Sequence, residues 1–284
     1  MYSISLMCKV LNVSPSGYYD ALRRADSARA QRQARIRQGV QQVYDEHDGI
    51  YGSWKIAEVM AGRDELESAC RNTVAAAMKE LGLRSRVSKA FVPTTTQVDP
   101  NKRPAENLLD QNFTADAPNR KWVTDITYLP TQRGWVYLAA VMDCFSRRIV
   151  GWSLGDSLAT ELVSDALRQA IEARRPRGRE LLHHSDRGSQ YTSDSYRKTL
   201  KTLGITCSMS RTGCCYDNAA MERFFWSLKH EWTNHERYVD LADARLSVFK
   251  YIDLFYNRKR IHQALGYVSP EQYEADHAPA TKVA

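Results

Sequence analysis

The sequence predicts an α/β protein, in which a mixed five-stranded sheet carries helices on its faces and small all-α, helix-turn-helix-like modules precede it. From residue 121 onward, strand-like and helical runs follow one another in the order βββ-α-β-α-β-α. The residues before 93 show helical patterns. Between the two regions, residues 93–117 are rich in Pro, Thr and Asn, a composition typical of a linker.

Length and composition limit the kind of protein. Because 284 residues exceed one ordinary domain, we expect a main domain of about 150 residues and smaller modules. The formal charge of +7 suits a polyanionic partner, although many ordinary basic proteins share it. Six scattered cysteines fit a reducing cytosol. With no basic leader and no run of about 18 apolar residues, we expect a soluble cytoplasmic protein with no membrane partner.

Residues 1–48 are predicted to form a helical N-terminal segment. Two short helices lie within residues 3–24, where Ser14 can cap the second helix and Pro15 can occupy its first position. This is a helix-turn-helix outline, and a plain helical hairpin explains it equally well. A polar, Arg-rich helix follows over residues 27 to about 47, which we interpret as a connector.

A second helical pair is predicted in a module over residues 49–92. Its first helix covers residues 51–62, and its second covers residues 67–83, with Gly82 as a stop signal. Functionally, the second helix is predicted to be a recognition helix with phosphate-contacting flanks, and a small helical domain with a basic surface is the alternative. The basic residues of this helix and its exit are Arg71, Lys79, Arg84 and Arg86.

The main domain is predicted over residues 118–275, with a tail at 276–284. Strands are expected where β-branched and aromatic residues gather between turn signals, and helices where apolar residues recur at helical spacing. The expected elements are strands at 121–129, 134–146 and 147–154, a helix at 159–175, a strand at 180–186, a helix at 193–204, a strand at 205–210 and a helix at 219–232.

Three carboxylates in separate segments are the main candidate site. Asp125 lies inside a predicted strand, where aspartate is depleted because its short side chain competes with the backbone, and metal binding would explain it. If a crossover lays the fourth strand beside the first, Asp125 and Asp186 become neighbours. Glu222 follows Asp186 with 35 residues between them, in the first turns of the last predicted helix. The three carboxylates are thus expected to meet at one edge of the sheet.

The last predicted helix carries two stripes. Glu222 and Lys229 lie on one of them together with Trp226, so a cation-binding carboxylate and a phosphate-binding lysine would face the same way. The alternatives are a favourable position of Glu222 in the helix dipole and a solvated face for Lys229. The other stripe, expected to pack on the sheet, consists of Met221, Phe225, Leu228 and Trp232.

Four sets of residues carry a resemblance to a known family: Asp125, the string His184 to Tyr191, the string Asp217-Asn218-Ala219 with Glu222, Phe224, Phe225, Leu228 and Lys229, and the late YNRKRIHQALGYVSPEQY. Over residues 45–275 they closely resemble the second reading frame of bacterial transposases of the insertion-sequence-three family. These are relatives of retroviral integrases, with an RNase H-like core and a D, D-35-E triad. The first 24 residues resemble the start of that frame. Two departures are Arg223, where members often have a small polar residue, and the lack of the retroviral zinc module, which this family also lacks.

The resemblance implies a mechanism and a set of partners. Asp125, Asp186 and Glu222 are expected to be the catalytic residues and to bind two Mg²⁺ ions, which Mn²⁺ can replace. Element ends would be cleaved and their 3′-OH joined to DNA by direct transesterification, through a circular intermediate. Lys229 and Arg187 are expected to contact DNA. Work on two DNA ends implies at least a dimer, in the bacterial cytoplasm and associated with the nucleoid.

Other polar residues of the main domain are expected to be structural. Asp143 is interpreted as a turn residue that bonds the backbone. His183 and His184 are interpreted as strand-end residues, because hard divalent ions prefer oxygen. Gly188 and Gln190, with Arg187, are expected to shape the loop beside Asp186, and Tyr191 to belong to the core. Zinc is not expected, because the adjacent His and Cys pairs lack the spacing of a tetrahedral site.

Two other functions are considered. A stand-alone RNase H-like nuclease would need the triad but not the helical modules. A DNA-binding regulator with a non-catalytic core is the second, and the intact triad counts against it, because clustered carboxylates repel one another without a metal. Since finding element ends takes a substantial sequence-reading domain, we also expect the active form to be a fusion with an upstream-frame product that supplies it.

Overall fold

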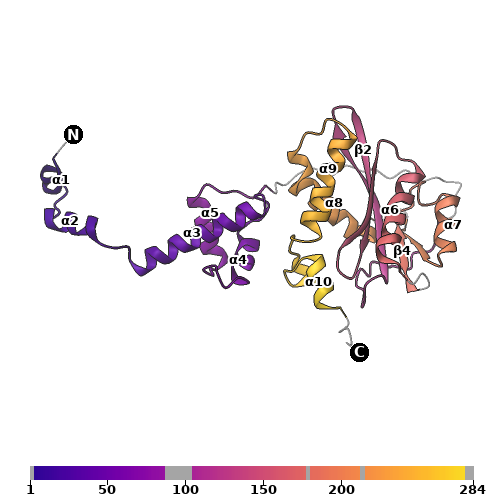
Figure 1. Ribbon diagram of the computed structural model, residues 1–284, viewed down its shortest axis with the longest axis horizontal. Helices are drawn as coiled ribbons and strands as arrows, with labels where there is room; N and C mark the ends of the chain where they lie inside the picture. The colour runs from indigo at the N-terminus through magenta and orange to yellow at the C-terminus, as the bar shows by residue number, and fades with distance from the viewer. Residues whose placement is uncertain (1–2, 87–103, 177–179, 212–214, 279–284) are drawn as a thin grey trace. The chain divides into compact units, whose positions relative to one another are not determined.

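The computed structural model describes residues 3–86, 104–176, 180–211 and 215–278. The chain forms two compact units, and the boundary between them lies between residues 86 and 87. The first unit is entirely helical, as predicted (Figure 1). Its helices are α1 (Ile4–Val10), α2 (Pro15–Arg23), α3 (Ala28–Glu46), α4 (Ser53–Ala61) and α5 (Arg71–Glu80).

The N-terminal helices begin at the predicted residues. Ser14 caps α2 by accepting a hydrogen bond from the backbone N–H of Gly17 (3.0 Å), and Pro15 fills the first helical position. Neither α2 nor most of α1 buries its side chains, and Cys8 is the buried residue of the pair. The described hairpin therefore has little core of its own.

Helix α3 has a role that the connector interpretation missed. Its residues Ile36, Val40 and Val43 are buried, and α3 contacts both α4 and α5. Helices α3, α4 and α5 therefore share one apolar core. The sequence did not indicate this, because the apolar stripe of α3 consists of only three side chains on a helix that is otherwise polar and Arg-rich. The domain boundaries at 48, 92 and 117 stay predictions.

The second unit is built on a five-stranded sheet with strand order β3-β2-β1-β4-β5. The first three strands are antiparallel neighbours, while β4 pairs in parallel with β1, and β5 pairs in parallel with β4. The predicted crossover beside the first strand is therefore confirmed. The strands are β1 (Lys121–Thr131), β2 (Gly134–Asp143), β3 (Ile149–Gly155), β4 (Leu182–Ser185) and β5 (Thr206–Met209).

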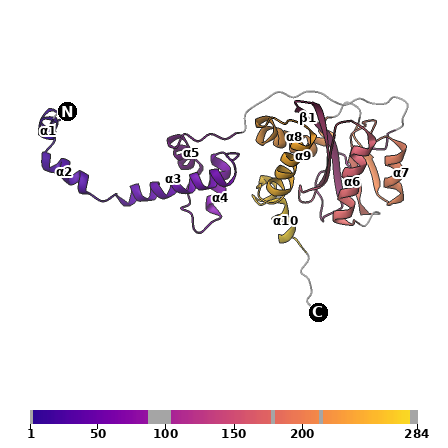
Figure 2. The same ribbon diagram turned by 45° about the horizontal axis from the view of Figure 1, so that its top comes forward.

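Helices cover both faces of this sheet (Figures 1 and 2). Helices α6 (Thr160–Arg174) and α7 (Asp194–Thr202) lie on one face, and α8 (Ala219–Glu231) and α9 (Leu241–Phe249) lie on the other. The mixed five-stranded α/β class is confirmed. The shorter elements after β5 are the 3-10 turns η2 (Cys215–Asn218), η3 (Thr233–His235) and η5 (Gln263–Leu265), the π-helical η4 (Lys250–Tyr256) and α10 (Pro270–Asp276).

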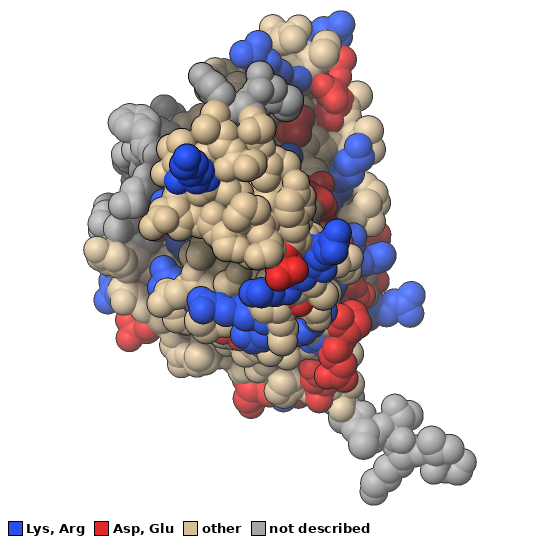
Figure 3. Space-filling model, turned by 90° about the vertical axis from the view of Figure 1, so that its left-hand side faces the viewer, with Lys and Arg blue, Asp and Glu red and all other residues tan. Residues whose placement is uncertain are grey.

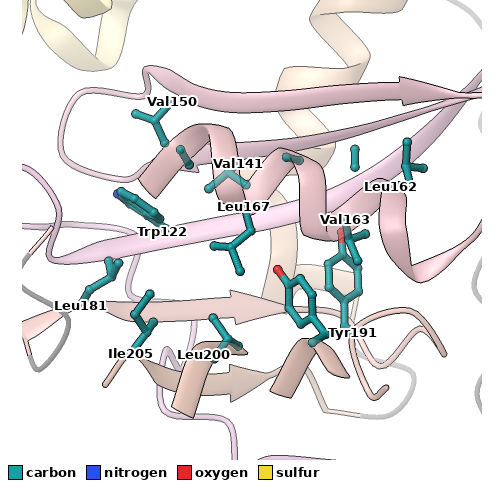
Figure 4. Close-up of a cluster of buried hydrophobic side chains, with 14 of the residues drawn as sticks. Trp122, Val141, Val150, Leu162, Val163, Leu167, Leu181, Tyr191, Leu200 and Ile205 are labelled. Carbon is teal, nitrogen blue, oxygen red and sulfur yellow. The ribbon is translucent and has the colours of Figure 1, made fainter. Parts of the chain in front are cut away.

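The core between the sheet and α6 is tightly packed (Figure 4). Trp122 of β1 is fully buried among aliphatic side chains of α6 and α7. Gly151 lets α6 approach β3 closely, because a Cβ at this position would lie 2.3 Å from the carbonyl oxygen of Ala166. This face holds the sheet in place, so the other face can carry the candidate site.

The predicted linker is only partly a linker. Residues 93–103 lie outside the described residues, but residues 105–111 pack on the second unit. The backbone N–H groups of Leu108 and Leu109 donate to Oγ of Ser208 in β5, and Leu109 is buried. The Pro- and Asn-rich composition indicated an irregular backbone, but it did not indicate that residues 105–111 pack on the second unit.

Candidate active site

The parallel pairing of β1 with β4 sets two carboxylates side by side. Val123 of β1 pairs with His184 of β4. Asp125 lies two residues after Val123, in the middle of β1, and Asp186 lies two residues after His184, just past the end of β4, so the two carboxylates lie at about the same level along the sheet. Side chains two residues apart also point to the same face as their starting residues.

Helix α8 brings the third carboxylate to this edge. Met221, Phe225 and Leu228 are buried against the sheet, as the predicted apolar stripe required, whereas Trp232 is only half-buried. Glu222 is exposed in the first turn of the helix. Just before α8, the side-chain amide of Asn218 donates to the carbonyl oxygen of Thr124 (3.1 Å), the residue before Asp125. This bond ties the start of α8 to the strand that carries the first carboxylate.

The three carboxylates and one lysine share an electrostatic environment. Burial raises the pKa of Asp125 well above its usual value, and the negative charges of Asp186 and Glu222 raise it further. Although Glu222 is exposed, partial loss of water around its carboxyl group also raises its pKa. Burial lowers the pKa of Lys229, while the charge of Asp125 opposes that shift. Asp125 therefore lies near both acidic partners and near the lysine.

This donor set suits a hard divalent cation, because its donor atoms are all carboxylate oxygens. One of them is already oriented, since Oδ1 of Asp186 accepts a hydrogen bond from the N–H of Gly188 (2.9 Å). Among the residues that the structure describes, no three His, Cys, Asp or Glu side chains are yet gathered closely enough to enclose an ion.

Lys229 faces the site rather than bulk solvent alone. Its Nζ lies 4.5 Å from the ring centroid of Tyr128, which is a cation–π contact. Arg187 has a backbone partner, because its Nε donates to the carbonyl oxygen of Ser210 (2.6 Å). Arg187 therefore holds the loop after β4 against the end of β5, and its predicted contact with DNA stays a prediction.

The two histidines before Asp186 are structural, as predicted. His183 bonds the hydroxyl of Tyr196 (2.8 Å), and His184 bonds the hydroxyls of Ser208 (2.8 Å) and Ser210 (3.1 Å). Burial lowers the pKa of His183 to about 3 and that of His184 to about 4, so both rings are neutral at physiological pH. They pack between β4, β5 and α7 without carrying charge.

Asp143 is also structural, as predicted. It is fully buried and accepts hydrogen bonds from the N–H groups of Asn119 (2.8 Å) and Phe145 (3.0 Å) and from the guanidinium of Arg174 (3.2 Å). The bond from Phe145 turns the chain, which is why β2 ends at Asp143 rather than at residue 146.

The loop after Asp186 also agrees with the prediction. The side-chain amide of Gln190 donates to the carbonyl oxygen of Leu158 (3.0 Å), which fixes the loop against the segment before α6. Tyr191 is buried in the core, with its hydroxyl 3.3 Å from Oγ1 of Thr124.

Sequence reasoning missed the role of Asp217. This carboxylate is fully buried, and it accepts hydrogen bonds from the backbone N–H and guanidinium of Arg211 and from the side-chain amides of Asn107 and Gln111. It thereby ties the segment before β1 to the start of α8. An aspartate just before a helix is usually interpreted as a helix cap. No local sequence signal therefore indicates that Asp217 binds Asn107 and Gln111, which lie far away along the chain.

The predicted DNA-contacting residues of the first unit are all exposed. Arg71, at the start of α5, lies over the ring of Trp54 in α4 at 5.2 Å. In the view of Figure 3, several Lys and Arg side chains lie next to one another, with Asp and Glu side chains among them and at their edge. The exposed basic residues of α5 and its exit are Arg71, Lys79, Arg84 and Arg86.

Family models match most of the chain. A model described as an HTH-like domain matches residues 30–91, and two models described as integrase core domain match residues 115–215 and 203–270. The fold and these matches define the class: a helix-turn-helix-like region followed by an integrase core. No helix among the described residues is long and apolar enough to cross a membrane.

Curated relatives identify the family within this class. Transposase InsF for insertion sequence IS3A of Escherichia coli K12 is 40% identical over 275 residues, which cover 96% of this chain and 94% of the relative. A 31 kDa protein of insertion element IS600 from Shigella sonnei is 39% identical over 267 residues, covering 94% of this chain and 97% of that protein. The chain belongs to the IS3 family of transposases, as its sequence predicted.

Solved structures of retroviral integrases are also similar. The catalytic core domain of HTLV-2 integrase in complex with magnesium has 16% identity and a TM-score of 0.44, covering 56% of this chain and 98% of that one. The intasome of simian T-cell lymphotropic virus in complex with a PP2A regulatory subunit has 14% identity and a TM-score of 0.48, covering 85% of this chain and 76% of that one.

Proposed function

We propose that this transposase cleaves the ends of an insertion sequence and joins the freed 3′-OH to DNA, with Asp125, Asp186 and Glu222 as its catalytic, metal-binding carboxylates. One observation supports this most strongly. The parallel register of β1 and β4 puts Asp125 level with Asp186, and the charges of Asp186 and Glu222 both raise the pKa of Asp125. Repulsion among clustered carboxylates lowers the stability of the fold, whereas a bound cation would offset that repulsion.

The three carboxylates would hold two Mg²⁺ ions, which Mn²⁺ can replace. When bound, the ions would activate the attacking oxygen and neutralise charge on the leaving oxygen. The raised pKa of Asp125 means that ionising this carboxyl is costly until a cation is present. Lys229 would supply the nearest fixed positive charge to the phosphate that enters beside Asp125.

The reaction consists of two displacements at phosphorus. In cleavage, the oxygen of water bonds to phosphorus, the bond from phosphorus to the 3′ oxygen breaks, and that oxygen leaves as a 3′-OH. In joining, the oxygen of this hydroxyl bonds to the phosphorus of another phosphodiester, the bond from that phosphorus to its own 3′ oxygen breaks, and that oxygen leaves as a new 3′-OH. No bond to the protein forms in either step. Joining one end of the element to the other would give a circular intermediate.

The basic residues are proposed to hold DNA at two places. Lys229 and Arg187 would contact backbone phosphate beside the carboxylates. In the first unit, α5 would act as the recognition helix, with phosphate contacts from Arg71, Lys79, Arg84 and Arg86. Each unit would thus contribute its own contacts to a shared substrate.

Work on two element ends requires at least two copies of the chain, so we propose a homo-oligomer. The helix-turn-helix-like region is small, and the α1–α2 hairpin adds little core. We therefore propose that an upstream-frame product, fused to this chain, supplies the main end-binding domain, and that the complex acts at the bacterial nucleoid.

The test is a strand-joining assay with the protein, Mg²⁺ and labelled DNA that carries the ends of its own element. We expect cleaved and joined strands, and we expect neither product from Asp125→Asn, Asp186→Asn or Glu222→Gln, although all three should still bind DNA. Near-normal joining by any one of them would refute its assignment.

A further inference from the structure

The late motif Tyr256 to Tyr273, which contributes to the family resemblance, has no part in the function proposed so far. Its first half contacts the helix that carries Glu222. The ring of Tyr256 meets the ring of Phe224 in α8 edge to face, with centroids 4.9 Å apart. The guanidinium of Arg260 reaches Glu231, the last residue of α8.

The contact between Arg260 and Glu231 is a two-pronged, buried ion pair. Nε of Arg260 donates to Oε2 of Glu231 (2.7 Å), and Nη2 donates to Oε1 (2.5 Å). Only 3% of Glu231 and 8% of Arg260 is exposed. Two further bonds complete the group: the hydroxyl of Tyr251 donates to Oε2 of Glu231 (2.8 Å), and Nη2 of Arg260 donates to Oγ of Ser227 (3.2 Å).

A buried ion pair of this kind is a poor way to gain stability, because apolar side chains of similar volume usually do as well. A planar, two-pronged pair instead fixes direction, because both oxygens of one carboxylate must meet two nitrogens in one plane. Two residues of an α-helix span a turn of about 200°. Glu231 and Lys229 therefore lie on nearly opposite faces of α8. A contact that fixes the direction of Glu231 also fixes the rotation of the helix about its axis, and so the direction in which Lys229 points.

The motif is itself anchored to the sheet. The side-chain amide of Asn257 accepts a hydrogen bond from the N–H of Ile149 and donates one to its carbonyl oxygen, both at 3.0 Å. Ile149 is the first residue of the edge strand β3. At the other end of α8, Asn218 bonds β1 beside Asp125. Helix α8 is thus held to the sheet at both ends, once directly and once through Arg260.

We propose that Arg260 is a positioning residue for strand transfer: through its two-pronged contact with Glu231 it fixes the rotation of α8, so that Glu222 and Lys229 face Asp125. The proposal rests on the proposed role of Glu222. Arg260 is buried and its side-chain hydrogen bonds are to Glu231, Ser227 and His262, so its effect is on the geometry of the helix. A lysine keeps the charge and the burial, but it cannot make both contacts.

The experiment compares Arg260→Lys and Glu231→Gln with the wild-type full chain. The joining rate at saturating DNA, the Kd for DNA and the Mg²⁺-induced rise in Tm are measured. We expect an unchanged Kd for DNA, a fall in joining rate of about 10- to 100-fold, as small misplacements of catalytic groups cause, and a smaller Mg²⁺-induced rise in Tm. Tyr251→Phe removes a single bond to Glu231, so it should fold in any case and shift the same two quantities less.

The matched control is Glu274→Gln in α10. Glu274 also belongs to a largely buried ion network, with Arg174 and Arg148, but it has no contact with α8 among the interactions of the described residues. It should lower Tm and leave the Mg²⁺ response and the joining rate unchanged. If the Arg260, Glu231 and Tyr251 variants behave like this control, the pair is merely structural and the inference is wrong. Glu222→Gln separates the two proposals: its normal joining would refute the role of Glu222 instead.

Discussion

At the residue scale, Asp125 differs from three other acids of the second unit in having no ion pair among the described residues. Asp143, Asp217 and Glu231 are more deeply buried, but each accepts hydrogen bonds from an arginine and from further donors. Asp125 has a hydrogen bond only from the next backbone N–H in the described structure, and its charged neighbours include two acids. The fold tolerates this cost at the place where a cation and a phosphate are expected.

Asp125→Asn should stabilise the metal-free protein. The folded-state pKa of Asp125 is raised, so this group makes the fold less stable as pH rises from about 3.9, the usual aspartate pKa, through the folded value. At pH 7.5 the variant should melt a few degrees higher in EDTA, since about 1 kcal/mol moves Tm by roughly 2–4 °C in a chain of this size. Mg²⁺ should raise the Tm of wild type, and of this variant much less.

Asp143→Asn is the control for that measurement. It removes a carboxylate that pairs with Arg174 and is not one of the three candidate carboxylates, so its Mg²⁺ response and joining activity should persist. A full Mg²⁺ response from Asp125→Asn, or a lower Tm in EDTA, would contradict the assignment of Asp125.

Lys229→Ala should weaken binding to every DNA sequence alike. If Nζ contacts one backbone phosphate, the slope of log K against log salt should fall by about 0.9. The measurement is a set of binding isotherms at salt concentrations from about 50 to about 200 mM. Lys198→Ala, an exposed lysine of α7, is the control. An unchanged slope for Lys229→Ala would return this residue to the solvated-face interpretation.

At the element scale, close backbone approach and exposed basic helices matter most. Helix α6 lies directly on β3 at Gly151, and α8 lies on β1, so the sheet is covered on both sides by helices with little room for adjustment. By contrast, the basic side chains of α5 point outward. We therefore expect substitutions at the close contact between α6 and β3 to change stability, and substitutions on α5 to change DNA binding.

Gly151→Ala should be strongly destabilising, because its Cβ would lie 2.3 Å from the carbonyl oxygen of Ala166 and 2.6 Å from the N of Ala170. Overpacking of this kind costs about 1–3 kcal/mol or more. Gly155→Ala is the control, since its nearest neighbour is a leucine methyl at 3.4 Å. Denaturant melts of both variants give the comparison, and equal stability of the two would show that α6 can shift away from β3.

Lys79→Ala with Arg84→Ala should reduce DNA affinity if α5 is the recognition helix. Two lost phosphate contacts would lower the salt slope by about 1.8. The comparison is Lys198→Ala with Lys201→Ala, which removes the same charge from α7. Equal losses in the two double variants would show that net charge alone governs binding, and that α5 has no special role.

At the scale of the whole molecule, the proposed function assigns the finding of DNA and its cleavage to different units. The first unit is a small helical module, and the second carries the carboxylates. Specific sites are usually bound about 10³–10⁷ times more tightly than random DNA, which takes a larger reading surface or several modules.

The isolated chain should therefore bind element ends with little preference over random DNA, because the fused upstream-frame product would supply the main end-binding domain. Competition binding at near-physiological salt measures the preference. The same assay with the fusion protein is the positive control. A strong preference by the isolated chain would show that its own helical modules suffice, and the fusion hypothesis would be wrong.

The sequence by itself determined the order of the elements, the class of the fold, the three candidate carboxylates and the family. These follow from local signals: alternation in strands, helical stripes such as Met221, Phe225 and Leu228, capping by Ser14, and strings of neighbouring residues. Even the pairing of Asp125 with Asp186 could be predicted, because a crossover between parallel strands leaves few arrangements.

Only the tertiary structure decided which buried charges are neutralised and by what. Arg260 meets Glu231 across 28 intervening residues, Asp217 meets Asn107 across more than 100, and the Arg-rich α3 hides the apolar stripe that makes it part of a core. Such contacts leave no periodicity in the sequence, because each depends on one side chain at each end. The free energy of each contact depends on the removal of water from both side chains, and this removal occurs only when the folded sheet has brought the two segments together.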